Sequence, residues 1–201
     1  RRRPTRPPPA PQAARVPCIG ASITDGDGID LRDVNGYPAQ MQRMLGKGYD
    51  VRNGGDRART MMNSGDLPYM NEQAWRDALA FNPDVVVIML GTNDSKTHNW
   101  VHKKDYARDL KKMLDALKAL PAKPKIFLCK PVPAVKDTWT ISEEVLTQEI
   151  APLLEKTVKK ENLAGIIDLH AAFDGKHDQF LEDGIHPNQA GARTIAETVA
   201  R

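Results

Sequence analysis

The stretch Val85–Leu90 (Val-Val-Val-Ile-Met-Leu) decides the fold class, because six apolar residues follow one another without polar alternation. Such a run is expected of a strand at the centre of a parallel sheet, where both faces are covered. The next residues, Gly91–Asp94 (Gly-Thr-Asn-Asp), are polar and favour a turn. We therefore expect a buried strand that ends in a loop of polar side chains.

Short apolar runs and amphipathic helical patterns alternate on both sides of this strand. Four more strands are expected, at Val16–Ile19, Tyr49–Val51, Lys125–Cys129 and Gly165–Leu169. Five helices are expected, at Tyr37–Leu45, Asn71–Phe81, Asp105–Leu120, Ser142–Glu161 (kinked at Pro152) and Gln189–Ala200. Alternating strands and helices predict a parallel sheet with helices on both faces. The predicted fold is a three-layer α/β/α, flavodoxin-like domain of about five strands.

Length and charge place one domain behind a short basic arm. The 201 residues are 40% hydrophobic and 27% charged, as in a globular domain. Five arginines and no acid before residue 16 contribute +5 to a net charge of +3, so residues 16–201 carry −2. This distribution argues against a nucleic-acid-binding domain. We predict a Pro/Arg-rich arm at 1–15, either a linker or a polyanion-binding tail, and one domain at 16–201.

From the sequence pattern we expect neither a membrane-spanning helix nor a signal peptide within these residues. The longest apolar run has six residues, far short of the roughly 18 that a membrane-spanning helix needs. The first residues contain no apolar core of a signal peptide. No membrane span is therefore predicted.

Polar or glycine residues follow four of the five expected strands. Ser22 follows the first, Gly54 and Gly55 the second, Gly91–Asp94 the third and His186 the fifth. In parallel sheets, ligands bind beyond the carboxyl ends of the strands. We expect these residues to meet at one edge of the sheet.

These residue types are suited to acyl transfer. Histidine exchanges protons near neutral pH, and Asp183, three residues before His186, can orient its ring. A serine such as Ser22 becomes a nucleophile when a base removes its proton, and an asparagine such as Asn93 can donate to an oxyanion. Taken singly, each has an ordinary explanation: a helix cap for the serine, a turn for the asparagine and a packed or surface position for the histidine.

Taken together, these residues resemble the SGNH (GDSL-like) hydrolase family. The matching segments are Gly20–Gly26, Val51–Gly55, Ile88–Asp94 and Asp183–Asn188. The resemblance implies that Ser22 is the nucleophile, that His186 is the general base and then acid, and that Asp183 orients it. It also implies an oxyanion hole made by the Ser22 N–H, the Gly55 N–H and the Asn93 amide. Within the family, the chain is most similar to bacterial carbohydrate acetylesterases of the sialate O-acetylesterase type.

The chain departs from the family pattern at two places. Ala21 stands where the family commonly has an aspartate before the nucleophile. After Gly55 the family usually has small residues and a second glycine, whereas this chain has Asp56–Arg59 (Asp-Arg-Ala-Arg). Gly54 therefore remains an alternative oxyanion donor.

The function implied by the resemblance is hydrolysis of small acyl esters, acetyl esters of carbohydrates above all, with no cofactor. A lysophospholipase or thioesterase of the same fold is one alternative, and a carbohydrate-binding domain without catalysis is another. The implied partner is a small-molecule or carbohydrate ester, with no nucleic acid. A secreted or periplasmic location is implied, a cytoplasmic one stays open, and the oligomeric state is not predicted.

Candidate substrate contacts follow the second, third and fourth expected strands. Trp100 and Trp139 either stack on a sugar or pack their loops, and Arg57 either holds an acidic group or is solvated. The histidines at positions 98, 102, 170 and 177 share no metal-ligand spacing with nearby carboxylates, so no metal site is predicted.

Overall fold

A five-stranded parallel sheet in the order β2-β1-β3-β4-β5 forms the centre of the computed structural model, which describes residues 11–201. The strands are β1 (Ala14–Gly20), β2 (Tyr49–Gly55), β3 (Val85–Met89), β4 (Lys125–Lys130) and β5 (Gly165–Asp168). This is the flavodoxin-like strand order, and the predicted fold class is confirmed. Most of the predicted arm, residues 1–10, lies outside the described residues.

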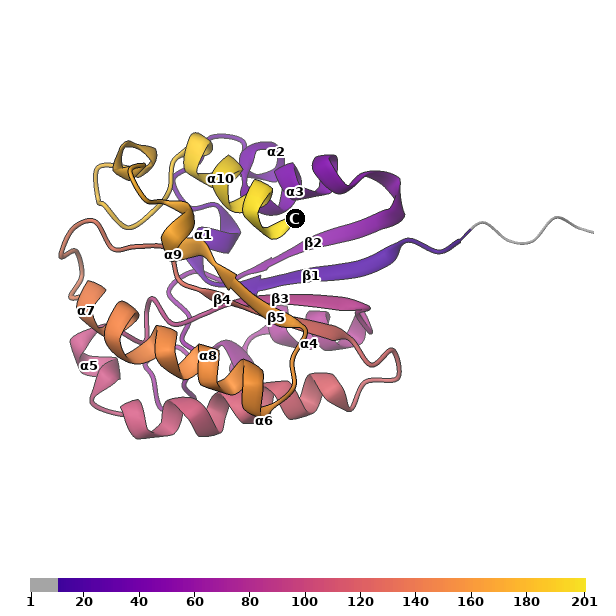
Figure 1. Ribbon diagram of the computed structural model, residues 1–201, viewed down its shortest axis with the longest axis horizontal. Helices are drawn as coiled ribbons and strands as arrows, with labels where there is room; N and C mark the ends of the chain where they lie inside the picture. The colour runs from indigo at the N-terminus through magenta and orange to yellow at the C-terminus, as the bar shows by residue number, and fades with distance from the viewer. Residues whose placement is uncertain (1–10) are drawn as a thin grey trace, which may run out of the picture.

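Helices cover both faces of the sheet (Figure 1). One face carries α3 (Tyr37–Leu45) and α10 (Gln189–Val199), and the other carries α4 (Gln73–Ala80), α6 (Tyr106–Lys118) and α8 (Ala151–Lys160). The short helices are α1 (Ser22–Asp25), α2 (Arg32–Asn35), α5 (Thr97–Trp100), α7 (Glu143–Val145) and α9 (Leu169–Ala172). Each face has its own apolar core, and β3 contributes side chains to both.

Two strands, β1 and β2, are several residues longer than predicted. β1 begins at Ala14, and Arg15 pairs with Asp84 at 3.2 Å, so the sheet includes two residues that had been assigned to the arm. The division of the chain into an arm and a domain otherwise stays a prediction. β2 continues to Gly55 because its last three residues pair with Cys18–Gly20 of β1. The residues Asn53–Gly55 therefore form the end of a strand, although their composition is typical of a turn.

The predicted helix at Ser142–Glu161 is interrupted shortly before the proline at which a kink was expected. A π-helical turn at Leu146–Ile150 separates α7 from α8, and Pro152 lies in the first turn of α8. Just before the proline, the Ala151 N–H donates to the carbonyl oxygen of Leu146, the i→i−5 bond of a π-helix. Proline itself lacks an N–H and cannot continue the regular i→i−4 pattern. Within residues 11–201, every helix is too short or too polar to cross a bilayer.

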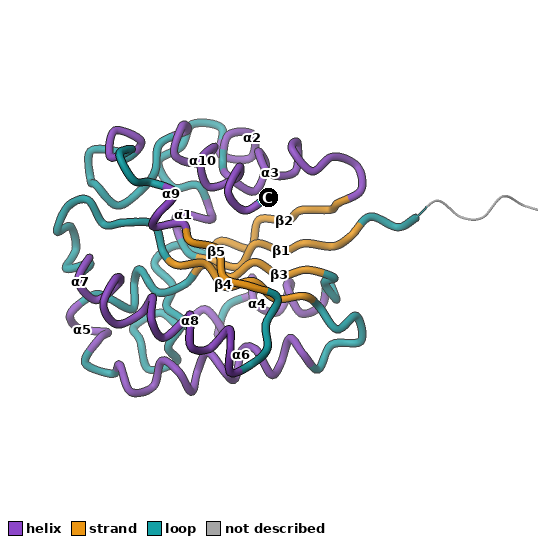
Figure 2. Tube along the Cα trace, in the orientation of Figure 1, coloured by secondary structure: helices purple, strands orange, loops and turns teal. Residues whose placement is uncertain are grey.

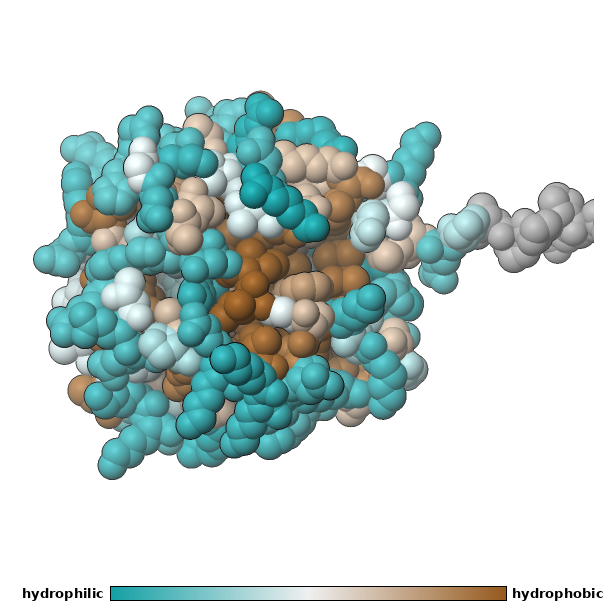
Figure 3. All heavy atoms as spheres, in the orientation of Figure 1, coloured by the Kyte–Doolittle hydropathy of each residue, from teal (hydrophilic) through white to brown (hydrophobic). Residues whose placement is uncertain are grey.

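The two ends of the sheet differ in character. Loops gather where the strands end, on the left of Figure 2. Near the amino ends of the strands, a mainly apolar cavity of about 330 Å³ lies between the sheet and the helices α3 and α10. Figure 3 shows apolar side chains gathered in a hollow between the two helical layers. The polar, loop-rich end is where a catalytic site is expected.

Candidate active site

Asp183 and His186 form a locally organised pair in the loop 181–188, which we call the histidine loop. Asp183 Oδ1 accepts hydrogen bonds from the N–H groups of Ile185 (2.8 Å) and His186 (2.9 Å). Its Oδ2 lies 2.6 Å from His186 Nδ1. A carboxylate there holds the ring proton on Nδ1, so Nε2 is left free to accept a proton.

The pKa of Asp183 fits this role. Burial alone would raise it, but the hydrogen bonds from the His186 N–H, the His186 ring and the Ile185 N–H together hold it below its ordinary value. Asp183 is therefore a carboxylate over the range in which histidine exchanges protons.

Ser22 lies directly opposite Nε2 of this histidine. It is the first residue of α1, just after β1, and its Oγ is 2.8 Å from His186 Nε2. The turn into α1 requires Gly20, because a Cβ there would lie 2.0 Å from Thr24 Oγ1. The hydroxyl does not cap the helix, since Ala21 occupies the N-cap position. Ser22, His186 and Asp183 thus form one hydrogen-bonded line.

A pocket of about 220 Å³ opens over this line, and we call it the serine pocket. Its walls come from the loops that follow β1, β2, β3 and β4 and from the histidine loop. It is lined by Ser22, Asp27, Arg57, Ala58, Thr92, Asn93, Lys96, Trp139, Ile141, Ile185 and His186. Five of the eight candidate site residues therefore line the pocket. Asp183 contacts the far side of the His186 ring, and Gly55 and Trp100 do not line the pocket.

Asn93 is positioned as an amide donor. Its side chain is buried, and its Nδ2 donates to the carbonyl oxygen of Arg59 at 3.1 Å. An amide nitrogen carries two hydrogens, so one remains for a ligand in the pocket. The contact to Arg59 fixes the amide in this orientation.

Gly55 is not placed as predicted. It ends β2, and its N–H donates to Asn53 Oδ1 at 2.9 Å instead of facing the pocket. The alternative donor, Gly54, also lies within β2. Ala58 lines the pocket instead, with φ of 64°, and no group in residues 11–201 accepts a hydrogen bond from its N–H. The left-handed conformation turns this N–H away from the regular hydrogen-bond pattern of a strand.

A buried carboxylate holds the segment 56–62, which we call the Ala58 loop. Asp94 accepts hydrogen bonds from the N–H groups of Met61 and Met62, both at 2.9 Å. Burial outweighs these two bonds and raises the pKa of Asp94 to about 6. Since Asp94 follows Asn93 directly, one short loop after β3 positions both the amide and the Ala58 loop.

The two candidate tryptophans differ. Trp139 is 55% exposed, and its ring stands edge-on to His186 with the centroids 5.8 Å apart. Trp139 and Thr140 both have positive φ (53° and 59°), a strained backbone that clusters at functional sites. Trp100 instead packs against Tyr106 at 5.9 Å and lies beside the core. The structure thus places only Trp139 at the pocket.

Sequence reasoning missed Asp27. Arg57 Nη2 donates to Asp27 Oδ1 at 2.5 Å, and Asp27 Oδ2 lies 3.9 Å from His186 Nε2. The only sequence signal was a polar, glycine-rich stretch after Ser22, in which Asp27 is one of several acids. Its position becomes apparent only when the loop is folded against the histidine.

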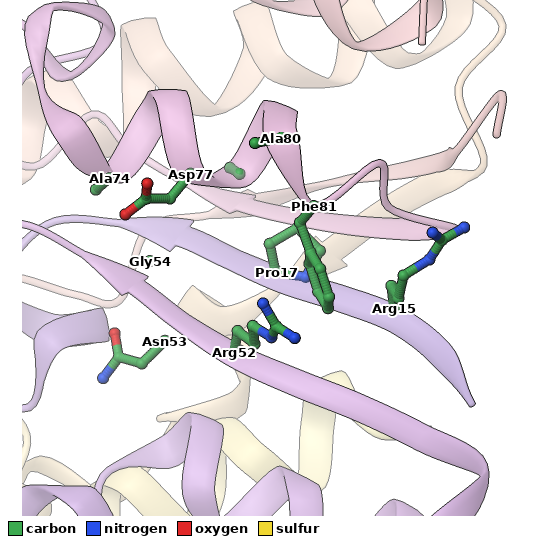
Figure 4. Close-up of a pocket in the computed structure, with 10 residues that line it drawn as sticks. Arg15, Pro17, Arg52, Asn53, Gly54, Ala74, Asp77, Ala80 and Phe81 are labelled. Atoms are coloured by element: carbon green, nitrogen blue, oxygen red, sulfur yellow. The ribbon is translucent and has the colours of Figure 1, made fainter. Parts of the chain in front are cut away.

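A second cavity in residues 11–201 lacks such an arrangement. It has a volume of about 630 Å³ and lies between β2 and α4, where the Arg52 guanidinium stacks 3.7 Å from the centroid of the Phe81 ring (Figure 4). It contains no histidine and no serine. Among residues 11–201, no group of three or more His, Cys, Asp or Glu side chains is placed to hold a metal ion.

Comparison with known proteins agrees with this geometry. The model of the GDSL-like lipase/acylhydrolase family matches residues 18–194. An acetylxylan esterase from Xylanibacter ruminicola is 51% identical over 211 residues, which cover 96% of the present chain and 44% of that protein. The present chain spans less than half the length of the curated relatives that it matches.

Solved structures share the fold at low sequence identity. An aryl esterase from M. smegmatis has a TM-score of 0.75 at 21% identity, with 94% of the present chain and 97% of that chain covered. A carbohydrate acetylesterase from Sinorhizobium meliloti has a TM-score of 0.73 at 20% identity, with 93% and 96% covered. These similarities establish the same architecture over nearly the whole chain.

Proposed function

Because the chain belongs to the GDSL-like lipase/acylhydrolase family, we propose that it is a serine esterase that removes small acyl groups, chiefly acetyl, from carbohydrate hydroxyls. The observation that carries the proposal is the hydrogen-bonded line from Ser22 Oγ through the His186 ring to Asp183, with contacts of 2.8 and 2.6 Å. A base aligned on a serine hydroxyl, with its tautomer fixed from behind, is the arrangement that activates a serine.

The reaction has two acyl-transfer steps. His186 Nε2 takes the proton of Ser22 as Oγ attacks the ester carbonyl. The same nitrogen then gives that proton to the departing sugar oxygen, which leaves an acetyl group on Ser22. In the second step, water takes the place of the sugar, acetate is released and Ser22 regains its proton. Asp183 stays ionised and stabilises the imidazolium in both steps.

Three donors are proposed for the oxyanion. The N–H of Ser22 has no partner within its helix because it belongs to the first turn. Ala58 and Asn93 line the same pocket, and the Ala58 N–H and the second hydrogen of the Asn93 amide are the other two proposed donors. Donors fixed before the reaction lower the barrier most when they point to where the negative charge develops.

The pocket favours a short acyl group on a polar alcohol. About 220 Å³ holds a small ester, and the walls include the charged Asp27, Arg57 and Lys96. The exposed face of Trp139 offers a surface for stacking on a sugar ring. The 51% identical relative is named an acetylxylan esterase, which supports an acetylated carbohydrate as the substrate class.

The test is a chain-length series of p-nitrophenyl esters from acetyl to octanoyl, with the wild type beside Ser22→Ala. We expect the highest kcat/KM for acetyl, a steady fall with chain length, and background rates in the variant. A maximum at octanoyl would favour a lysophospholipase or thioesterase. No turnover by the folded wild type would favour a carbohydrate-binding domain, and activity in Ser22→Ala would remove Ser22 as the nucleophile.

We further propose that the enzyme acts outside the cytoplasm, because an acetylated polysaccharide does not cross a membrane intact. Activity in the culture medium or periplasmic fraction of the source cells would support this location, and activity confined to the cytoplasm would contradict it.

A further inference from the structure

Asp27 lies in the serine pocket but has no part in the mechanism given above. Its backbone N–H donates to the Ser22 carbonyl oxygen at 3.0 Å, so it follows the nucleophile by little more than one helical turn. Its Oδ2 is 3.9 Å from His186 Nε2, the nitrogen that faces Ser22. Asp183 lies at the other ring nitrogen. The imidazole therefore has a carboxylate near each of its nitrogens.

The two oxygens of Asp27 have different surroundings. Oδ1 accepts the hydrogen bond from Arg57, which orients the carboxylate and balances its charge. No group in the described part of the chain donates a hydrogen bond to Oδ2. An ionised carboxylate oxygen is a strong acceptor, and this one lines a pocket open to a ligand.

The proposed reaction indicates which substrate group lies beside Asp27 Oδ2. His186 Nε2 must protonate the departing sugar oxygen, so that oxygen lies within hydrogen-bond distance of Nε2. In a sugar, the hydroxyl on the adjacent ring carbon lies beside the departing oxygen. Oδ2, at 3.9 Å from Nε2, is within reach of that hydroxyl.

We propose that Asp27 is a specificity-determining residue that accepts a hydrogen bond from a free hydroxyl next to the ester. The preferred substrates are then acetyl esters of vicinal diols, that is, sugars with an acetyl group beside an unmodified hydroxyl. Simple alcohols and fully acetylated rings lack this donor. The inference rests on the proposed esterase function and narrows its substrate class.

If Asp27 instead acts on the charge of His186, the expected effect of removing it is different. If Asp27 acted only by stabilising the imidazolium, its removal would slow all esters by the same factor. If it binds the neighbouring hydroxyl, its removal acts only on substrates that carry that hydroxyl. The discriminating quantity is therefore a ratio of kcat/KM values between two matched substrates.

The experiment uses two methyl xylosides that each carry one acetyl group. One has a free hydroxyl on the adjacent carbon, and the other has hydrogen in its place. Initial rates at mildly acidic pH limit acetyl migration between hydroxyls. For the wild type we expect kcat/KM to be about 10- to 100-fold higher with the hydroxyl, as for a hydrogen bond to a charged group.

Three variants test whether the difference in kcat/KM between the two xylosides depends on Asp27. Asp27→Ala should bring this ratio close to one, and Asp27→Asn, which keeps an acceptor oxygen, should retain part of it. Asp33→Ala removes the same charge from a neighbouring exposed position outside the pocket and should keep the wild-type ratio. Thermal unfolding of each variant verifies that it is folded.

The outcomes separate the two proposals. A wild type that hydrolyses both xylosides equally well, or an Asp27→Ala variant that keeps the full ratio, overturns the role of Asp27 and leaves the esterase intact. Equal slowing of both substrates in Asp27→Ala assigns Asp27 to the histidine instead of the hydroxyl. Failure of the proposed esterase function is recognised separately with p-nitrophenyl acetate: either the folded wild type does not turn it over, or its turnover persists in Ser22→Ala.

Discussion

The histidine loop (181–188) and the Ala58 loop (56–62) both supply groups to the serine pocket, but they are held in different ways. In the histidine loop, Asp183 bonds to backbone and ring groups only two and three residues away. The Ala58 loop depends on Asp94, more than thirty residues further along the chain. The contacts in the histidine loop are local, so they can be predicted from the sequence. The contacts that hold the Ala58 loop form only when the folded sheet brings β2 and β3 near each other.

The largest expected effect lies in the histidine loop. His186→Ala removes the base, and kcat for an acetyl ester should fall roughly 10⁴- to 10⁶-fold, as for loss of a base that acts as a unit with its serine. The fold should persist, because the Asp183 contacts to backbone N–H groups do not need the imidazole. Steady-state kinetics together with a thermal melt checks both points, and a loss below tenfold would contradict the proposed role.

The next effect distinguishes the two candidate oxyanion arrangements. Asn93→Ala removes an amide donor and should lower kcat about 10²- to 10³-fold. Asn53→Ala is the matched control: it releases the Gly55 N–H from its side-chain acceptor and should leave kcat within about twofold, as for a surface change. Comparable losses in the two variants would return Gly55 to the oxyanion hole and remove the distinction between the loops.

The two loops should also respond to pH in opposite directions. The folded pKa of Asp94, about 6, lies above the ordinary value of 3.8. Its contribution to the free energy of unfolding is therefore full below pH 3.8 and is lost as pH rises from there through about 6. The folded pKa of Asp183 is lowered, so its contribution is present at neutral pH and is lost as pH falls through that lowered value.

Asp94→Asn tests this difference. At low pH the variant should be less stable by about 1–3 kcal/mol, because one of the N–H groups of Met61 and Met62 loses its acceptor. The difference in the free energy of unfolding between the two proteins should narrow as pH rises. Only the wild type loses the stabilising contribution of Asp94, which is on the order of 3 kcal/mol. Urea unfolding of both proteins at a series of pH values measures the gap, and a gap that widens with pH would contradict the sign.

The smallest effect concerns the backbone of Ala58. Ala58→Gly removes left-handed strain of about 1 kcal/mol while adding chain entropy to the unfolded state, so stability should change by less than about 1 kcal/mol. The N–H donor remains, and kcat should stay within about twofold. A large gain or loss of kcat would show that the methyl group, rather than the N–H, is what the pocket uses.

The difference between local and long-range contacts explains which parts of the molecule can be predicted from the sequence. Apolar runs and helical periodicity gave the strands, the helices and the sheet type, since these depend on neighbours in the chain. The end of β2 was missed because Asn53–Gly55 has the composition of a turn, and only pairing with β1 makes it a strand.

The same division applies to the site. Ser22, Asp183 and His186 are recognisable because each lies in a short motif, and the structure brings them into contact. The family resemblance implied Gly55 as an oxyanion donor, whereas in the structure Ala58 lines the pocket with a left-handed backbone conformation. Asp27 and Trp139 reach the histidine through loop conformations that no local pattern encodes.

The most direct test of the central claim is covalent labelling with a phosphonate ester that reacts with activated serines. The labelled protein is digested with trypsin, and the peptide Val16–Arg32, in which Ser22 is the only serine, is examined by mass spectrometry. We predict one phosphonyl group on Ser22 in the wild type and none in His186→Ala over the same time. Labelling of another residue, or equal labelling without the histidine, would contradict a serine esterase activated by His186.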